Sequence, residues 1–418
     1  MKTKFLLSFL SLFSSISLLA DDWPAFGGPD RNQVSLEKGL RADWGDEEPE
    51  RLWSMDVGLG YSAVVEVKGK AYTQGYSSGK NTLFCVDAET GKVLWTHQYP
   101  CEKAPKYFQG GSRSTPAISD GILYLNSHQG DFYALDAANG KILWTKNLVK
   151  DFQGRRPDWG FSGSPLCAAG MVIFQTGSEK GSLVALDAKS GEERWRAGSD
   201  EAAYSSPMLR TYGKEEVLVF NGFGLVSHRL SDGAELKKYQ HKTRYGINAT
   251  QPIDLGPSVL VSSAYGKGSA LVDLERRRPR ALWESSFFSC QMASLVSSGD
   301  YAYGIEGQAG GREDQARLFC LEIKKGKKRW EKKGFGLGTV LLVENRLVIL
   351  SDRGELTLAE ANHYNFRELA RFQILSGKEN WTPPTYANGR MHCRSSQGKW
   401  VCLKMGTQPA VIQGEGAD

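Results

Sequence analysis

The sequence of 418 residues has little that is typical of membrane-spanning or helical proteins. Beyond the N-terminus, no apolar run reaches the roughly 18 residues that a membrane-spanning helix requires. Methionine is scarce, with 7 residues, and long runs of Ala, Glu, Leu and Lys are missing. The formal net charge of +5 is too small to indicate a nucleic-acid partner. We therefore expect neither a transmembrane segment nor nucleic-acid binding.

The seven cysteines lack the spacing of a metal or redox motif. None lies in a C-x-x-C pair, which excludes a zinc ribbon, a thioredoxin-type motif and a haem attachment site. The six histidines also lack metal-ligand spacing, so we expect no metal site. Cys393 and Cys402 flank a predicted hairpin turn at 395–398, and a disulfide between them stays open. Cys85 and Cys320 occupy equivalent strand positions and are predicted to be buried small hydrophobes.

The N-terminal segment indicates export. Lys2 and Lys4 precede an apolar, Ser-rich stretch that ends at Leu19, and Ala20 provides a small residue at the expected cleavage site. The next residue is Asp21 rather than Cys, so the lipid anchor of bacterial lipoproteins cannot be attached there. We expect residues 1–20 to be a signal peptide and the mature protein to be soluble, in the periplasm or otherwise exported.

Glycine and aromatic residues are abundant and occur in a repeated unit. There are 47 glycines, about 11 % of the chain against a usual level of about 7 %, together with 11 Trp and 16 Tyr. Four segments align without gaps, LFCVDAETGKVLW, FYALDAANGKILW, LVALDAKSGEERW and LFCLEIKKGKKRW, and 270–283 is a weaker copy. The recurring acidic residue, glycine and tryptophan are Asp87, Gly91, Trp95, Asp136, Gly140, Trp144, Asp187, Gly191, Trp195, Trp283, Gly326 and Trp330.

Each unit predicts two strands joined by a tight turn. The alternating apolar residues indicate a half-buried strand, the Asp carboxylate caps the turn, and the glycine supplies a positive φ. The tryptophan of the next strand must bury its ring, which we expect to pack against the following unit. The Trp position recurs every 42 to 51 residues from Trp53 onward, the length of a four-stranded propeller blade. In the fourth unit Lys237 replaces the tryptophan.

Eight such units predict an all-β, eight-bladed propeller. The last unit, RMHCRSSQGKWVCLKMG, lacks an outer strand, whereas the segment around Trp53 has no earlier strands of its own. Pairing the two closes the ring and leaves no open edge. The predicted organisation is a signal peptide at 1–20, an N-terminal arm at 21–50, the propeller at 51–406 and a C-terminal tail at 407–418.

The L-D-A-x-x-G-K-x-x-W unit resembles the quinoprotein-type, PQQ-like β-propeller repeat over nearly all of residues 50–405. The start DWPAFGGPDRN is similar to that of exported PQQ-like propellers of planctomycete and verrucomicrobial bacteria. This resemblance implies two functions. One is that of PQQ-dependent alcohol dehydrogenases, and the other is that of BamB-type scaffolds, which assist β-barrel insertion into the outer membrane without enzymatic activity.

The sequence departs from both relatives. Resemblance to the dehydrogenases implies adjacent cysteines and a calcium site with a catalytic Asp, but this sequence has no adjacent cysteines. Resemblance to the scaffolds fits the length and blade number, although those proteins are usually lipid-anchored. We expect a non-catalytic binding or assembly scaffold of the cell envelope, with no catalytic residues and no cofactor. The alternative is a PQQ-dependent oxidoreductase or PQQ-binding protein with PQQ and Ca²⁺, and carbohydrate recognition also stays open.

Long connectors at 96–114 and 145–163, and the residues just before each innermost strand, predict a ligand-binding funnel at the mouth of the channel. Aromatic rings and guanidinium groups there are suited to stacking a planar ligand or binding carboxylates. The alternative is that these loops simply cover the channel. The predicted funnel residues are Tyr61, Tyr107, Arg113, Arg155, Trp159, Phe161, Tyr204, Asn248, Gln291 and Trp381.

A second candidate site is basic. The outer turns of the fifth and sixth units are rich in Lys and Arg, and equivalent turns of neighbouring blades lie side by side. A solvated run of charge is one interpretation. The other is a docking patch for an envelope protein or an anionic surface. Its residues are Arg276, Arg277, Arg278, Arg280, Lys324, Lys325, Lys327 and Lys328.

Overall fold

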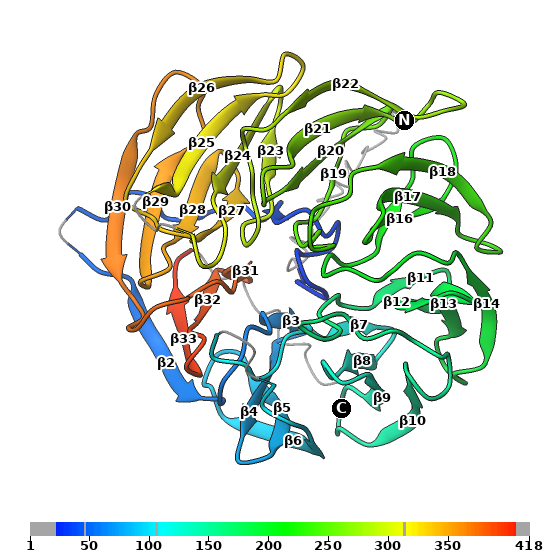
Figure 1. Cartoon of the computed structure of the whole chain (residues 1–418). Helices are drawn as coiled ribbons and strands as arrows, with labels where there is room; N and C mark the ends of the chain where they lie inside the picture. Colours follow the sequence, from blue (N-terminus) through cyan, green and yellow to red (C-terminus); the bar gives the residue numbers. More distant parts are fainter. Residues whose placement is uncertain (1–21, 46, 105–107, 312–314, 407–418) are drawn as a thin grey trace, which may run out of the picture.

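The computed structural model describes residues 22–45, 47–104, 108–311 and 315–406, and these form an eight-bladed β-propeller around a central channel (Figure 1). The predicted signal peptide and C-terminal tail lie outside the described residues. Seven blades follow one another in chain order. Each is an antiparallel meander of four consecutive strands, and the first of them lies nearest the channel. The all-β, eight-bladed fold is therefore confirmed.

The first four blades comprise the following strands. Blade one contains β3 (Val65–Val67), β4 (Lys70–Ser77), β5 (Lys80–Asp87) and β6 (Val93–Pro100). Blade two contains β7 (Ala117–Ser119), β8 (Ile122–Asn126), β9 (Asp131–Asp136) and β10 (Ile142–Asn147). Blade three contains β11 (Leu166–Ala168), β12 (Met171–Ser178), β13 (Gly181–Asp187) and β14 (Glu193–Ala197). Blade four contains β15 (Met208–Arg210), β16 (Glu216–Phe220), β17 (Gly224–Arg229) and β18 (Glu235–Gln240).

The remaining blades complete the ring. Blade five contains β19 (Ile253–Asp254), β20 (Ser258–Ser263), β21 (Gly268–Asp273) and β22 (Arg280–Ser285). Blade six contains β23 (Val296–Ser298), β24 (Tyr301–Glu306), β25 (Arg317–Glu322) and β26 (Lys327–Lys332). Blade seven contains β27 (Thr339–Val343), β28 (Arg346–Leu350), β29 (Glu355–Glu360) and β30 (Glu368–Gln373). Blade eight contains β31 (Thr385–Ala387), β32 (Arg390–Arg394), β33 (Lys399–Lys404) and the N-terminal β2 (Glu50–Asp56).

The ring closes as the sequence predicts. Strand β2 pairs antiparallel with β33, with Trp53 opposite Cys402 and Met55 opposite Trp400. The N-terminal strand thus supplies the outer strand of the last blade, so the two ends of the propeller are joined by a hydrogen-bonded ladder.

The tryptophans join neighbouring blades through the glycine turns. Trp283 Nε1 of blade five donates a hydrogen bond to the Ile323 carbonyl of blade six at 2.7 Å. A Cβ atom added to Gly326, in the same turn, would lie 2.7 Å from the Trp283 ring. The glycine is therefore required both for its positive φ of 63° and for the close approach of the ring. The same ring-over-glycine contact recurs at Trp53, Trp95, Trp144 and Trp195.

Lys237 replaces this tryptophan contact with a polar one. Its Nζ donates a 2.7 Å hydrogen bond to the Arg276 carbonyl, in the equivalent turn of the next blade. The fifth blade has no glycine in that turn, so a ring would not fit there as it does elsewhere. The degenerate fourth unit thus keeps the link between blades through a flexible ammonium group.

The N-terminal arm crosses the central channel (Figure 1). Trp23 pairs with Glu66 in blade one, and the Arg31 guanidinium donates to the Ser164 and Pro165 carbonyls beside blade three. Strand β1 (Val34–Ser35) then pairs parallel with β27 of blade seven. Because blades three and seven lie opposite each other in an eight-membered ring, the arm must pass through the channel between them.

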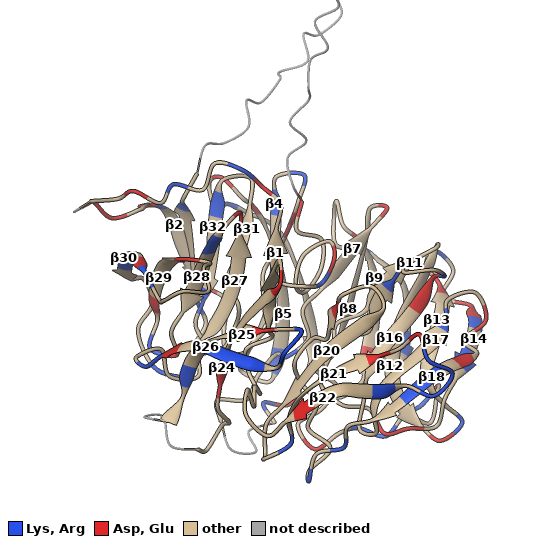
Figure 2. Cartoon of the chain, turned by 90° about the horizontal axis from the view of Figure 1, so that it is seen from above, with Lys and Arg blue, Asp and Glu red and all other residues tan. Residues whose placement is uncertain are grey.

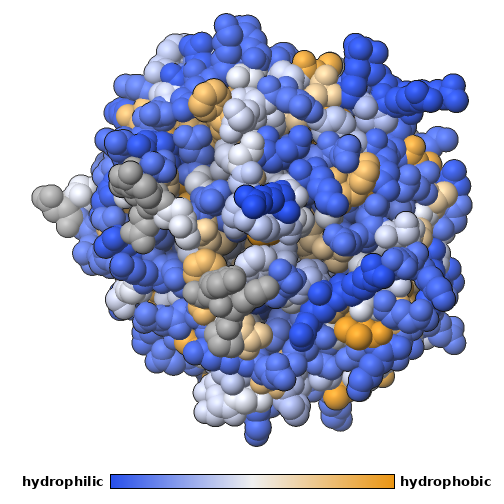
Figure 3. Space-filling view, viewed as in Figure 1, coloured by the Kyte–Doolittle hydropathy of each residue, from blue (hydrophilic) through white to orange (hydrophobic). Residues whose placement is uncertain are grey.

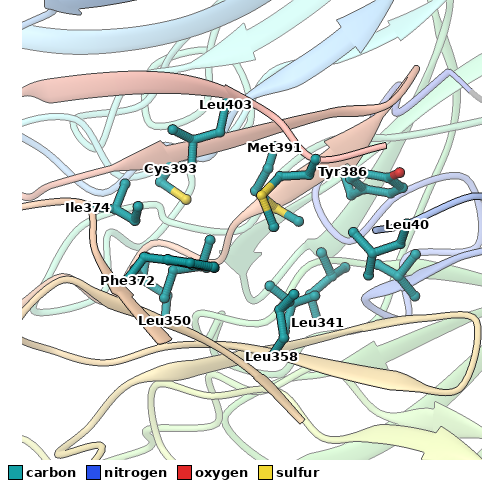
Figure 4. Close-up of a cluster of buried hydrophobic side chains, with 14 of the residues drawn as sticks. Leu40, Leu341, Leu350, Leu358, Phe372, Ile374, Tyr386, Met391, Cys393 and Leu403 are labelled. Carbon is teal, nitrogen blue, oxygen red and sulfur yellow. The ribbon is translucent and has the colours of Figure 1, made fainter. Parts of the chain in front are cut away.

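The core consists of apolar clusters between neighbouring blades. Between blades seven and eight, Leu341, Leu350 and Leu358 face Tyr386, Met391, Cys393 and Leu403, and Leu40 of the arm covers one end (Figure 4). All of these side chains are buried. At about 25 cal/mol per Å² of apolar surface removed from water, such clusters provide the main favourable term in folding.

The disulfide left open by the sequence is not formed. Cys393 pairs with Val401, and Cys402 pairs with His392, so the two cysteines are offset by one residue in the ladder. Side chains alternate along a strand, and the two thiols therefore point to opposite faces of the blade. Cys85 and Cys320 are fully buried among apolar side chains, as predicted.

Within the described residues, the structure has no helix with the length and hydropathy needed to cross a bilayer.

Candidate functional sites

The face of the propeller that carries the blade connectors has a cavity of about 190 Å³ at the mouth of the channel. The structure brings six of the predicted funnel residues together around it, and this face is shown in Figure 3, where apolar residues lie among polar ones near the centre. The cavity arises because the innermost strands converge at the channel, and the residues just before them point across it. The six residues are Tyr61, Arg113, Trp159, Tyr204, Gln291 and Trp381.

Aromatic rings form the walls of this funnel. Tyr61 and Trp381 stack with ring centroids 5.6 Å apart and an interplanar angle of 16°. Phe108 packs edge-on against Trp381 at 5.0 Å, and Trp159 packs edge-on against Tyr204 at 6.0 Å. These contacts fix the rings before any ligand arrives, which lowers the entropy cost of binding a flat molecule.

Arg113 is the one charged side chain among the described residues that line the cavity. It makes a single long hydrogen bond, 3.5 Å from Nη2 to the Ala104 carbonyl. Burial lowers the pKa of its guanidinium, and the nearby Tyr61 and Tyr204 hydroxyls act in the opposite direction. Burial also raises the pKa of Tyr204 to about 12, so that hydroxyl stays neutral at physiological pH.

Three predicted funnel residues lie elsewhere. Phe161 is 3 % exposed and packs in the cluster between blades two and three, and Asn248 is fully buried. The Asn248 amide donates to the Asn221 and His241 carbonyls, so it supports the loop backbone. Arg155 lies outside the cavity and forms a 2.7 Å ion pair with Glu179. Tyr107 lies outside the described residues.

The sequence did not single out Phe26, which also lines the cavity. It belongs to the arm, where Trp23 to Phe26 form a short apolar stretch before Gly27 and Gly28. Both glycines have positive φ, and a Cβ on Gly28 would lie 2.9 Å from the Trp23 ring. The apolar stretch indicated a packed segment, but only the path of the arm through the channel brings Phe26 to the funnel.

One buried thiol–imidazole pair has the composition of a nucleophile and base. Cys101 Sγ lies 3.6 Å from His128 Nδ1. Burial raises the pKa of the Cys101 thiol to about 12 and lowers the pKa of His128 to about 4. Both groups are therefore neutral at physiological pH, which favours a structural role over a thiolate–imidazolium pair.

The basic turns of blades five and six lie on the face opposite the funnel, because the turn between the third and fourth strands of a blade emerges at the strand ends opposite to the connectors. Lysine and arginine form a visible run on β26 (Figure 2). Ion pairs neutralise part of the patch, with Arg276 bonded to Asp273, Lys324 to Asp300, Lys325 to Glu322 and Lys328 to Glu331. Among the described residues of this patch, four are exposed and form no ion pair, namely Arg277, Arg278, Arg280 and Lys327.

Comparison with known proteins agrees with this geometry. A family model described as outer membrane protein assembly factor BamB matches residues 102–332, more than half of the chain. The chain belongs to this family of PQQ-like repeat propellers. The match covers blades two to six, and so includes the 145–163 connector, most of the 96–114 connector and both basic turns.

Similar solved structures include both relatives that the repeat implies. BamB from Moraxella catarrhalis has a TM-score of 0.63 and 16 % identity, covering 85 % of this chain and all of that one. The quinohemoprotein alcohol dehydrogenase from Comamonas testosteroni has a TM-score of 0.69 and 15 % identity, covering 95 % of this chain and 82 % of that one. At these identities the likeness establishes the fold alone.

A curated relative matches over a short stretch. The tetrathionate hydrolase of Acidianus ambivalens is 34 % identical over 58 residues, 14 % of this chain. This match spans one tenth of that protein's length, so it gives no information about the activity of this chain.

The residues present do not fit the PQQ and calcium of the dehydrogenases. Calcium takes six to eight oxygen ligands, yet the described lining of the funnel contains no carboxylate. The described residues also hold no group of three His, Cys, Asp or Glu suited to a metal ion. PQQ carries three carboxylates on a fused ring system, whereas the cavity offers about 190 Å³ and one guanidinium among its described lining.

Proposed function

We propose that the protein is a non-catalytic binding scaffold of the cell envelope, which contacts an acidic surface of an envelope protein through the basic turns of blades five and six. The observation that carries this proposal is the set of four exposed, unpaired cationic side chains on neighbouring turns, Arg277, Arg278, Arg280 and Lys327. Rigid turns hold these charges in place, and such patches steer association with an oppositely charged partner.

A patterned protein surface suits this patch better than a uniform anionic membrane. The carboxylates of Asp273, Asp300 and Glu322 lie beside the basic turns and form ion pairs with other cations of the patch. A protein partner can match this mixed pattern of charge with carboxylates and cations of its own, whereas a membrane of anionic lipids offers charge of one sign. Membership of the BamB-described family and the predicted export signal support the cell envelope as the setting.

Neutralising the patch is the direct test. In envelope extracts at low salt, we expect the wild-type protein to retain a partner. The variant R277Q/R278Q/R280Q/K327Q should retain about tenfold less of that partner, because surface charges act over about 10 Å at 0.1 M salt. The matched control is K92Q/K141Q/K189Q/K214Q, which removes four exposed lysines from turns of blades one to four on the same face. The control variant should retain the partner.

Two results would count against the proposal. One is equal retention by the patch variant and the control variant, which would mean that the charges of blades five and six do not select the partner. The other is patch-dependent binding to phosphatidylglycerol vesicles with no retained protein, which would assign the patch to a membrane surface instead.

A further inference from the structure

We infer that the funnel binds an aromatic ring that carries a single carboxylate, supplied either by a free aromatic acid or by the C-terminal aromatic residue of a polypeptide. The funnel and the basic patch lie on opposite faces, so this inference is independent of the proposed function. It depends on the size of the cavity, on its aromatic walls and on the guanidinium of Arg113, which lines the cavity and makes one long hydrogen bond.

The cavity sets the size of the ligand. Its volume of about 190 Å³ is below the roughly 300–1,000 Å³ of pockets that bind drug-sized molecules. Such a space accommodates about one aromatic ring with a small polar group. Fused-ring cofactors and oligosaccharides therefore exceed it.

The walls select a flat, apolar body. Tyr61 and Trp381 present a pre-stacked pair, Phe108 closes one edge, and Tyr204 forms part of the opposite wall. Phe26 of the arm adds a further apolar surface. Rings arranged in this way bind another ring by offset stacking and edge contacts, in addition to burying its apolar area.

Two buried donors in the lining lack acceptors. Arg113 Nε and Trp381 Nε1 are both inaccessible to solvent and form no hydrogen bond. The terminal nitrogens of the Arg113 guanidinium make one long hydrogen bond, from Nη2 to the Ala104 carbonyl at 3.5 Å, so the group keeps donors for a ligand. These two atoms are the buried, unsatisfied side-chain groups among the described lining residues.

The other polar groups of the lining are already bonded within the protein. Tyr61 donates to Glu379 at 3.2 Å, and Tyr265 accepts a hydrogen bond from the Gln291 amide at 3.0 Å. The Gln291 carbonyl oxygen accepts from the Ala309 N–H at 2.7 Å. The funnel therefore has donors and one positive charge to offer, and an ionised carboxylate is an acceptor-only group with one negative charge.

Calorimetric titration of the wild-type protein with a matched ligand series tests this inference. Phenylacetate represents the free acid and N-acetyl-L-phenylalanine the C-terminal residue. N-acetyl-L-phenylalaninamide removes the carboxylate, and acetate removes the ring. We expect at least one of the two aromatic acids to bind, N-acetyl-L-phenylalaninamide to bind at least tenfold more weakly than the acid that binds, and acetate to give no heat of binding.

Two variants locate the site. Arg113→Gln should weaken binding of the acid at least tenfold while leaving binding of the amide unchanged, and thermal melting checks that the variant is folded. The matched control is Arg155→Gln, on the same face but outside the cavity, which should leave binding unchanged.

The outcomes separate the two sources of the ligand. Binding of N-acetyl-L-phenylalanine without phenylacetate assigns a polypeptide C-terminus, the reverse assigns a free acid, and binding of both supports the shared chemistry. Equal affinity for the acid and the amide would overturn the inference. So would binding of neither acid by the wild-type protein, or full affinity in the folded Arg113→Gln variant.

Discussion

At the residue scale, the contact that recurs between blades is a tryptophan ring against a turn glycine. In blade two, Gly140 has a φ of 74°, and a Cβ there would lie 2.6 Å from the Trp95 ring of blade one. This contact was predictable from the sequence because the Asp, Gly and Trp of one unit fix a local turn. The glycine also leaves room for the tryptophan ring of another blade to pack against it, and this second role becomes apparent only when the blades are assembled.

Substituting Gly140 separates these two roles. We expect Gly140→Ala to destabilise the protein by about 1–3 kcal/mol more than Gly121→Ala, because the methyl group must displace the indole ring. Gly121 is the matched control in the same blade, with a φ of 76° and nothing within 4 Å of an added Cβ. Its substitution should cost only the backbone strain, about 1–2 kcal/mol. Urea unfolding measures both, and equal losses would contradict the assigned ring contact.

The funnel shows where residue-level prediction fails. Tyr204 and Gln291 line the cavity, whereas Phe161 and Asn248, chosen by the same rule, are buried and do not reach it. Near the end of a connector, a shift of one residue turns a side chain from the channel into the sheet, since neighbouring side chains point to opposite sides. No local pattern in the sequence fixes that register.

At the element scale, closure depends on more than the β2–β33 ladder. Glu66, in the middle of the inner strand of blade one, contacts Arg390 and His392 of blade eight, with 2.8 Å from its Oε2 to His392 Nε2. Asn388 Nδ2 also donates to it at 2.8 Å. Burial disfavours the charged carboxylate, but the hydrogen bonds and charges of His392 and Arg390 outweigh it and lower the pKa of Glu66.

This cluster makes closure sensitive to acid. A carboxyl group whose pKa is lowered by folding stabilises the protein above its unfolded pKa, near 4.5, and this stabilisation is lost as the pH falls through the folded pKa. We expect Glu66→Gln to lower the free energy of unfolding by about 3–5 kcal/mol at pH 7, because it leaves a buried guanidinium without its counter-charge. The difference from wild type should shrink below pH 4.5.

Denaturant unfolding across this pH range provides the measurement. Glu50→Gln is the control, since Glu50 is exposed in the same closure and lies 4.0 Å from Lys404. An exposed pair of this kind contributes about 0–1 kcal/mol. A difference between wild type and Glu66→Gln that stays constant from pH 7 to pH 2 would show that the Glu66 charge does not hold blades one and eight together.

At the scale of the whole molecule, the ring was predictable because its physical cause repeats. Each sheet cannot bury its own tryptophan, so eight copies must pack in sequence and close. The N-terminal arm contains no copy of the repeated unit. Its path through the channel from Trp23 to β1 could therefore not be derived from the spacing of the repeats. The same holds for the basic turns, because the sequence shows their charge but not which side chains the neighbouring carboxylates neutralise.

The fold itself is shared by BamB and by a quinohemoprotein alcohol dehydrogenase, so the distinction lies in the side chains. Here the described funnel lining combines aromatic rings with Arg113 and no carboxylate, and the exposed cations gather on the opposite face. The central claim of this account is that the propeller acts by binding.

Addition of PQQ and Ca²⁺ to the purified protein tests that claim most directly. With primary alcohols as electron donors and an artificial dye as acceptor, we predict no alcohol-dependent dye reduction above that of protein without PQQ. A quinoprotein alcohol dehydrogenase reconstituted in parallel provides the positive control. Alcohol-dependent turnover by this protein that requires both PQQ and Ca²⁺ would contradict the account.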